Sequence, residues 1–104
     1  MRCLYVILFV ALSVHAETVM VKYRGPVNLD KFECQQSPQS SVVWRTCYSE
    51  RNQYLVVNLR GAYYHYCRVP KAVVNEWRGS ASLGRYYGDR IKGNFDCRQG
   101  GVPD

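Results

Sequence analysis

Four cysteines, Cys34, Cys47, Cys67 and Cys97, constrain what this chain of 104 residues can fold into more than any other feature. The fifth cysteine, Cys3, falls in a predicted signal peptide, and the even number that remains after its removal is typical of a disulfide framework in a short exported chain. A domain of this size buries only about 60–65% of its unfolded surface when it folds. Two disulfides, worth roughly 2–4 kcal/mol each, would therefore stabilise it substantially. None of the spacings fits a zinc knuckle, so we expect two disulfides and no metal or other cofactor.

The first 16 residues predict the export that disulfides require. Arg2 precedes an apolar run over residues 3–14, and Val14 and Ala16 occupy the −3 and −1 positions of a small-residue cleavage site. Cys3 lies ahead of the run, so it is not a lipid-modified cysteine. An uncleaved anchor is the alternative, but a membrane span needs about 20 apolar residues. We expect a signal peptide over residues 1–16, cleaved after Ala16, and a periplasmic or secreted protein without stable membrane insertion.

Three segments have the composition of strands. Residues 42–48, 54–59 and 62–68 are rich in β-branched and aromatic side chains, and they are joined by short polar connections. Arg60 and Gly61 form a tight turn in which the glycine can adopt a positive φ. Consecutive strands with such short connections predict an antiparallel meander.

Two short helices should follow the meander. Pro70 suits a first helical turn, an apolar stripe with helical period runs to Trp77, and Gly79 ends the helix. Ser82 is a candidate N-cap for a second helix through residue 87. Residues 91–97 are expected to return as an extended segment.

These elements predict an α+β fold, a three-stranded antiparallel meander covered on one face by two short helices and stapled by disulfides. A fourth, edge strand remains an open alternative. Residues 17–39 are expected to form an N-terminal extension, residues 40–97 the domain, and residues 98–104 a flexible tail.

The domain also carries an ordered series of short motifs. They are Ser40-Ser41, Cys47-Tyr48, Leu55-x-Val57-x-Leu59, Gly61-x-x-Tyr64-x-Tyr66, Val69-Pro70, Ser82-x-Gly84-Arg85-Tyr86-Tyr87 and Ile91-x-Gly93. The series resembles the KTSC domain family, small bacterial domains that are also appended to some lysyl-tRNA synthetases. The resemblance implies a small sheet-plus-helix module and supplies no activity, although nucleic-acid binding has been suggested for the family. The signal peptide and the four cysteines depart from the intracellular pattern and weigh against an RNA role.

The faces of the strands restrict the disulfide pairing. Cys47 and Cys67 should lie on the face opposite the tyrosines, since side chains alternate along a strand. The outer strands of a meander lie about 10 Å apart, too far for a disulfide, whose Cα atoms are roughly 4.4–6.8 Å apart. Either Cys34–Cys47 with Cys67–Cys97 or Cys34–Cys67 with Cys47–Cys97 remains, and shorter loops favour the first.

Catalytic patterns are not evident. His65 lies in a strand without a recognisable nucleophile, and the carboxylates are scattered singly. The sequence contains no glycine-rich loop of the kind that binds phosphate groups. We therefore expect no enzymatic activity.

Binding features are clearer. The formal net charge is +6, and aromatic and basic residues interleave in two segments, residues 63–68 and 85–92. Such a surface suits an anionic ligand, a sugar, an envelope protein or single-stranded nucleic acid. Tyr64 and Tyr66 are expected to pack beneath the helices. The candidate ligand-binding residues are Tyr63, His65, Arg68, Ser82, Gly84, Arg85, Tyr87, Arg90 and Lys92.

One local anion site is a further hypothesis. If Ser82 caps a helix, the backbone N–H groups near Gly84 and Arg85 would point outward, beside the Arg85 guanidinium. Simple capping without a ligand is the alternative.

The leading functional prediction is an exported, non-enzymatic binding module. A nucleic-acid-binding domain and an envelope structural or assembly protein are the alternatives. Neither the ligand nor the oligomeric state follows from the sequence.

Overall fold

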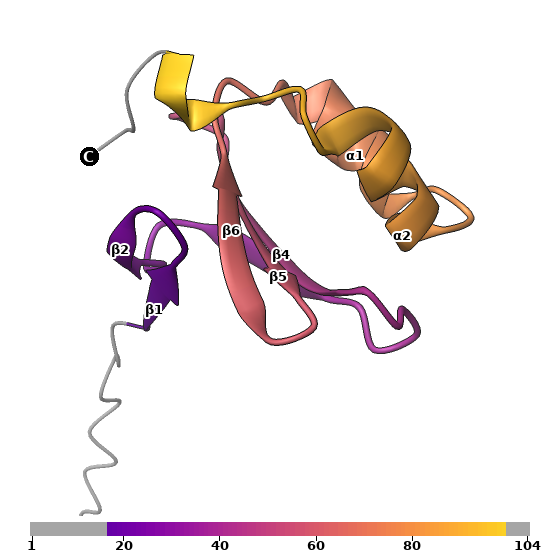
Figure 1. The fold of residues 1–104 in the computed structure, drawn as a ribbon, viewed down its shortest axis with the longest axis horizontal. Helices are drawn as coiled ribbons and strands as arrows, with labels where there is room; N and C mark the ends of the chain where they lie inside the picture. The colour runs from indigo at the N-terminus through magenta and orange to yellow at the C-terminus, as the bar shows by residue number, and fades with distance from the viewer. Residues whose placement is uncertain (1–16, 100–104) are drawn as a thin grey trace, which may run out of the picture.

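The computed structural model describes residues 17–99, which form a six-stranded sheet with two short α-helices (Figure 1). The predicted signal peptide and residues 100–104 of the predicted tail lie outside the described residues. The strands are β1 (Thr18–Val21), β2 (Gly25–Asn28), β3 (Glu33–Gln36), β4 (Val43–Ser49), β5 (Tyr54–Leu59) and β6 (Ala62–Tyr66). The helical elements are α1 (Lys71–Arg78), α2 (Leu83–Tyr86), the π-helical turn η1 (Tyr87–Ile91) and the 3₁₀ turn η2 (Cys97–Gln99).

The predicted meander is the central part of a larger sheet. Strands β4, β5 and β6 pair antiparallel in sequence order, as expected. Residues 17–39 do more than extend the domain, since they supply β1, β2 and β3, which flank the meander on both sides. Each of these strands has only four residues, too few for an alternating pattern to be recognised. The α+β class is confirmed, with six strands in place of the predicted three.

The order of the strands curls the sheet. They lie in the order β2-β1-β6-β5-β4-β3, so the outermost strands β2 and β3 are joined directly by residues 29–32. A linker this short brings the two edges toward each other. Figure 1 shows the β1–β2 hairpin on the side of the meander opposite the helices.

Two apolar cores result, one on each face of the meander. The helix-side core packs the sheet against α1, α2 and η1, with Leu55, Val57 and Trp77 at its centre. The inner core lies within the curl and includes Val21, Val56, Cys47 and Cys67. Strand β5 is buried on both faces from Tyr54 to Val57, which explains its nearly continuous apolar sequence.

Turn chemistry sets the register of the central hairpin. Arg60 and Gly61 have φ angles of 52° and 101°, the pair of positive values that a two-residue type I′ turn requires. Leu59 therefore pairs with Ala62, and the Asn58 Oδ1 atom accepts a hydrogen bond of 2.7 Å from the Gly61 N–H.

Both disulfides form in the pairing favoured by loop length. Cys34 and Cys47 are direct neighbours on β3 and β4, with their Cα atoms 4.0 Å apart. Cys67 joins Cys97 over a Cα separation of 4.8 Å. Cys47 and Cys67 share the inner core, on the face away from the helices, as the alternation of side chains predicts.

The first helix ends at Gly79 as expected, and its buried Trp77 donates a hydrogen bond of 2.9 Å from Nε1 to the Leu83 carbonyl oxygen. The second helix continues past Gly88 as η1, because this carries Ile91 into the helix-side core. Residues 92–95 form turns and bends, not the extended segment that the sequence indicated for residues 91–97. None of the helices within residues 17–99 is long and apolar enough to cross a membrane.

Candidate ligand-binding groove

A groove of about 760 Å³ opens at the end of β6, facing the chain that follows the helices. This size lies in the range of small-ligand sites, roughly 300–1,000 Å³. We call it the tyrosine groove. Its aromatic wall comprises Tyr23, Tyr64, Tyr66, Tyr87 and Phe95. Its polar groups come from His65, Lys92, Asn94, Asp96 and Arg98.

The second disulfide builds one wall of the groove. It ties Cys97 to Cys67, the residue that follows β6, so residues 93–98 return beside the strand. The Cys67 N–H also donates a hydrogen bond of 2.9 Å to the Phe95 carbonyl oxygen. The groove therefore depends on a covalent link between two segments that are 30 residues apart in the sequence.

A pair of tyrosine hydroxyls lies in the aromatic wall. The hydroxyls of Tyr66 and Tyr87 are 2.5 Å apart, and their rings meet edge to face with centroids 6.0 Å apart. Burial, and next the hydrogen bond to Tyr87, raise the pKa of Tyr66 well above its ordinary value. Tyr66 therefore keeps its proton at neutral pH. Since one hydroxyl donates to the other, the second retains a hydrogen for a ligand acceptor.

His65 lies on β6 between Tyr64 and Tyr66, with its side chain on the opposite face. Its Nδ1 atom is 2.8 Å from the hydroxyl of Tyr54, which is only 2% exposed. Burial, and next the positive charge of Arg24, lower the pKa of His65 below its ordinary value, while Asp96 acts in the opposite direction. The imidazole is therefore neutral at neutral pH and is already engaged by Tyr54.

The rim of the groove is net positive. Asp96 is paired with Arg98 at 2.7 Å, and the hydrogen bonds from Arg98 are the main reason that the pKa of Asp96 falls to about 2. Lys92 also lines the groove and is exposed, and it forms no ion pair with another residue of the described part of the chain. The groove thus combines aromatic rings with an available ammonium group.

Three of the predicted binding residues, His65, Tyr87 and Lys92, come together in this groove. Arg68 lies next to it, beside a smaller hollow of about 310 Å³ that it shares with Phe95.

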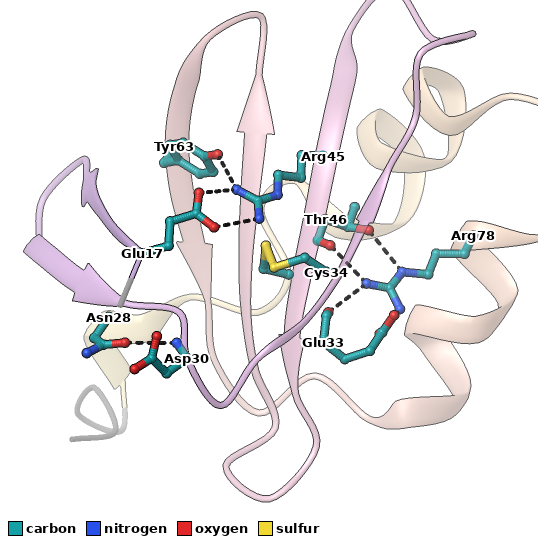
Figure 2. The surroundings of a disulfide bond; sticks show 10 residues. Glu17, Asn28, Asp30, Glu33, Cys34, Arg45, Thr46, Tyr63 and Arg78 are labelled. Atoms are coloured by element: carbon teal, nitrogen blue, oxygen red, sulfur yellow. Dashed lines mark hydrogen bonds and ion pairs between the residues drawn. A yellow bond between two sulfur atoms is a disulfide. The ribbon is translucent and has the colours of Figure 1, made fainter. Parts of the chain in front are cut away.

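Two others are used elsewhere. Tyr63 points into the curl and accepts a hydrogen bond of 3.1 Å from Arg45 (Figure 2). Arg90 pairs with Glu76 at 3.6 Å and lies over the Tyr86 ring, 5.5 Å from its centroid.

The predicted anion site at the second helix has the geometry of a simple cap. The Ser82 Oγ atom accepts the Arg85 N–H at 3.2 Å, and α2 has only four residues. Gly84 lies against Val42, whose side chain is 3.4 Å from where a Cβ atom would be. Ser82, Gly84 and Arg85 line a separate hollow and contribute nothing to the tyrosine groove.

Sequence reasoning placed Tyr64 and Tyr66 in the core and did not select Phe95. Tyr66 does pack against the helix-side core, but both tyrosines are half-buried and line the groove. The Tyr-x-Tyr pattern at the end of a strand was the available signal. The groove around it is formed with Tyr87 and residues 92–98, whose position beside β6 the sequence does not indicate.

A larger cavity of about 930 Å³ lies between the β4–β5 connection and α1. Its charged side chains largely pair with one another: Lys71 with Glu50 at 3.1 Å, and Arg78 with Glu33. Arg78 is also held by the Thr46 side chain and carbonyl oxygen at 2.9 Å each. Because these groups satisfy one another, the tyrosine groove is the better candidate site.

Comparison with known proteins identifies the family. The KTSC domain model matches residues 39–95, more than half of the chain. The crystal structure of a KTSC domain protein from Yersinia pestis matches with 27% sequence identity and a TM-score of 0.59, covering 62% of this chain and 92% of that chain. No curated protein gives a match. The family match includes Tyr64 and Tyr66 and leaves β1, β2 and β3 outside it. This chain belongs to the KTSC domain family.

Proposed function

We propose that this protein is an exported, non-enzymatic binding module that holds its ligand in the tyrosine groove. The observation that carries the proposal is the groove itself: half-exposed aromatic rings, a hydroxyl pair and Lys92, which has no ion-pair partner within residues 17–99, converge on one cavity of about 760 Å³. A mainly apolar cavity with a few converging polar groups is the usual form of a ligand site.

Two features support binding without catalysis. His65, the imidazole nearest the groove, is engaged by a buried tyrosine hydroxyl and is not paired with a nucleophile. The four cysteines of the described chain are oxidised to disulfides and cannot act as thiolates.

Export is supported by the same two disulfides, because such bonds persist in oxidising compartments. The test is the intact mass of protein recovered from the exported fraction, before and after reduction and alkylation. A product beginning at Glu17 that takes four labels only after reduction is expected. A full-length product with free thiols would contradict export.

Nucleic acid is a weaker candidate for the groove. Single-stranded nucleic acid needs a basic track for successive phosphates, whereas of the two cations that line the groove, Lys92 and Arg98, the second is already paired with Asp96. Binding to an oligonucleotide would weaken steeply as salt rises. Binding to aromatic and hydrogen-bonding groups would not.

The groove is tested by NMR titration of the disulfide-bonded protein with three probes: a set of neutral and acidic oligosaccharides, an oligothymidylate and a random-sequence peptide pool. We expect one class to shift the amides of residues 64–66 and 92–98, and Tyr64→Ala to abolish those shifts. Trp44→Ala, a truncation of another exposed aromatic residue, is the matched control. Shifts that Tyr64→Ala leaves unchanged would refute the assignment.

A further inference from the structure

The edge of β6 is open at one residue within the tyrosine groove. In an antiparallel ladder, the backbone groups of alternate residues point to alternate sides. Leu59 and Ala62 flank the two-residue turn, so Tyr64 and Tyr66 direct their N–H and C=O groups to β5. Tyr63 and His65 then direct theirs away from β5, and the bond of 2.9 Å from the Lys22 N–H to the Tyr63 carbonyl oxygen confirms this for Tyr63.

The neighbours of His65 on this edge are paired, whereas His65 has no backbone partner among residues 17–99. Strand β1 pairs with β6 at Tyr63 alone and then turns away. At the other end, the Cys67 N–H is bonded to Phe95. Within residues 17–99, the His65 N–H and C=O have no hydrogen-bond partner. Residues 63 to 67 span roughly 13 Å, enough for three to four residues of an extended chain.

We infer that the ligand of the tyrosine groove is an extended peptide segment that pairs its backbone with His65. This deepens the proposed function and rests on it. The peptide donates one N–H to the His65 carbonyl oxygen and accepts the His65 N–H through one carbonyl, in the manner of an added β-strand.

The chemistry around this edge defines the side chains of the peptide. Because side chains alternate along a strand, the peptide residues on either side of the paired one face Tyr64 and Tyr66. Apolar or aromatic side chains suit those rings and the neighbouring Tyr87. The ammonium group of Lys92 at the rim suits an acidic side chain or a terminal carboxylate.

A sugar or an oligonucleotide would engage fewer of the groups in the groove than a peptide would. Both can stack on the tyrosines and offer single donors and acceptors, but only a peptide backbone repeats an N–H and a C=O with the spacing of a strand. Exposed strand edges are also the places where proteins recruit further strands. The open edge therefore favours a peptide among the ligands that the groove admits.

The unliganded protein gives a first test by amide hydrogen exchange. The Tyr64 N–H is bonded to β5 and should exchange at least tenfold more slowly than the His65 N–H. Equal protection of the two amides would show that His65 is already paired and would overturn the inference.

The decisive test uses a random heptapeptide library panned on the disulfide-bonded protein, followed by N-methyl scanning of the enriched peptides. Methylation of one ligand amide should weaken binding roughly tenfold or more, since it removes the donor to His65, while the other amides tolerate it. Peptide binding should also slow exchange of the His65 N–H at least tenfold. Lys92→Gln should weaken an acidic peptide several-fold, and Lys31→Gln, outside the groove, should not.

The outcomes separate this inference from the proposed function. Peptide binding that N-methylation does not affect would overturn the pairing. Oligosaccharide or oligonucleotide binding that depends on Tyr64, without peptide binding, would overturn the peptide and leave the groove as the site. If no probe binds in a Tyr64-dependent way, both proposals fail.

Discussion

Arg45 shows how a single side chain holds the beginning of the described chain in place. Its guanidinium donates to both carboxylate oxygens of Glu17, at 2.5 and 2.8 Å, and to the Tyr63 hydroxyl at 3.1 Å (Figure 2). The side chain is only 15% exposed, and Nε has no hydrogen-bond partner among the described residues. Glu17 is thus the counter-charge of a cation that is largely withdrawn from water.

Glu17→Gln should destabilise the fold by about 1–2 kcal/mol, because the Arg45 guanidinium would lose its carboxylate partner while remaining largely buried. The hydrogen bond from Arg45 lowers the pKa of Glu17, so this contribution is present above the ordinary value of 4.5 and is lost as the pH falls through the lower value in the folded state. Urea unfolding at pH 7 measures the effect. Glu50→Gln, which removes an exposed ion pair, is the control and should cost less than about 0.5 kcal/mol. Equal losses would refute this role of Arg45.

His65 should make stability depend on pH near neutrality. Burial lowers its pKa below the ordinary value of 6.5, so the unfolded chain binds the proton more readily than the folded one. Stability is then greatest above pH 6.5 and decreases as the pH falls toward the folded-state pKa. Urea unfolding between pH 5 and pH 8 checks this. His65→Asn should flatten the profile in that window, and an unchanged slope would contradict the assignment.

At the scale of elements, the two disulfides have different tasks. Cys34–Cys47 joins strands that are already paired, whereas Cys67–Cys97 holds η2 and the turns before it against the end of β6. The first closes a separation of 13 residues and the second a separation of 30. The second therefore restricts the unfolded chain more and also forms the groove.

Replacing Cys67 and Cys97 together by serine should cost roughly 3–4 kcal/mol and abolish ligand binding in the groove. Replacing Cys34 and Cys47 together should cost less and leave binding intact, since neither residue lines the groove. Thermal unfolding and the NMR titration described above measure both quantities. Binding retained without Cys67–Cys97 would show that the groove forms independently of the disulfide.

At the scale of the whole molecule, the N-terminal hairpin closes the inner core. Val21 on β1 is 3% exposed and packs among the inner-core residues, while its neighbour Met20 is 68% exposed. The residues outside the family match therefore bury apolar surface that the meander alone would leave open to water.

Val21→Ala should destabilise the protein by about 1–3 kcal/mol, through lost burial and the cavity left behind. Met20→Ala, on the opposite face of the same strand, should change stability by less than about 0.5 kcal/mol. Urea unfolding compares the two variants. If both substitutions lower the free energy of unfolding by less than about 0.5 kcal/mol, the β1–β2 hairpin does not unfold together with the rest of the domain.

Local patterns were sufficient for the elements whose residues interact with near neighbours. The turn at Gly61, the helix ending at Gly79 and the Ser82 cap depend on contacts within a few residues, and the meander pairs strands that follow one another in the sequence; all were predicted. For the disulfides, the separation of the outer strands left two possible pairings, and the shorter loops favoured the one that forms.

The sequence by itself determined the α+β class, the two disulfides, the family and the central strands, since periodicity, cysteine spacing and turn residues act over short distances. Only the tertiary structure decided the six-strand curl and the groove. Strands of four residues carry too little pattern to reveal their partners, and β1 pairs with a strand about 40 positions away. The open edge at His65 follows from where that long-range pairing ends, and the groove around Tyr64 and Tyr66 follows from the Cys67–Cys97 link.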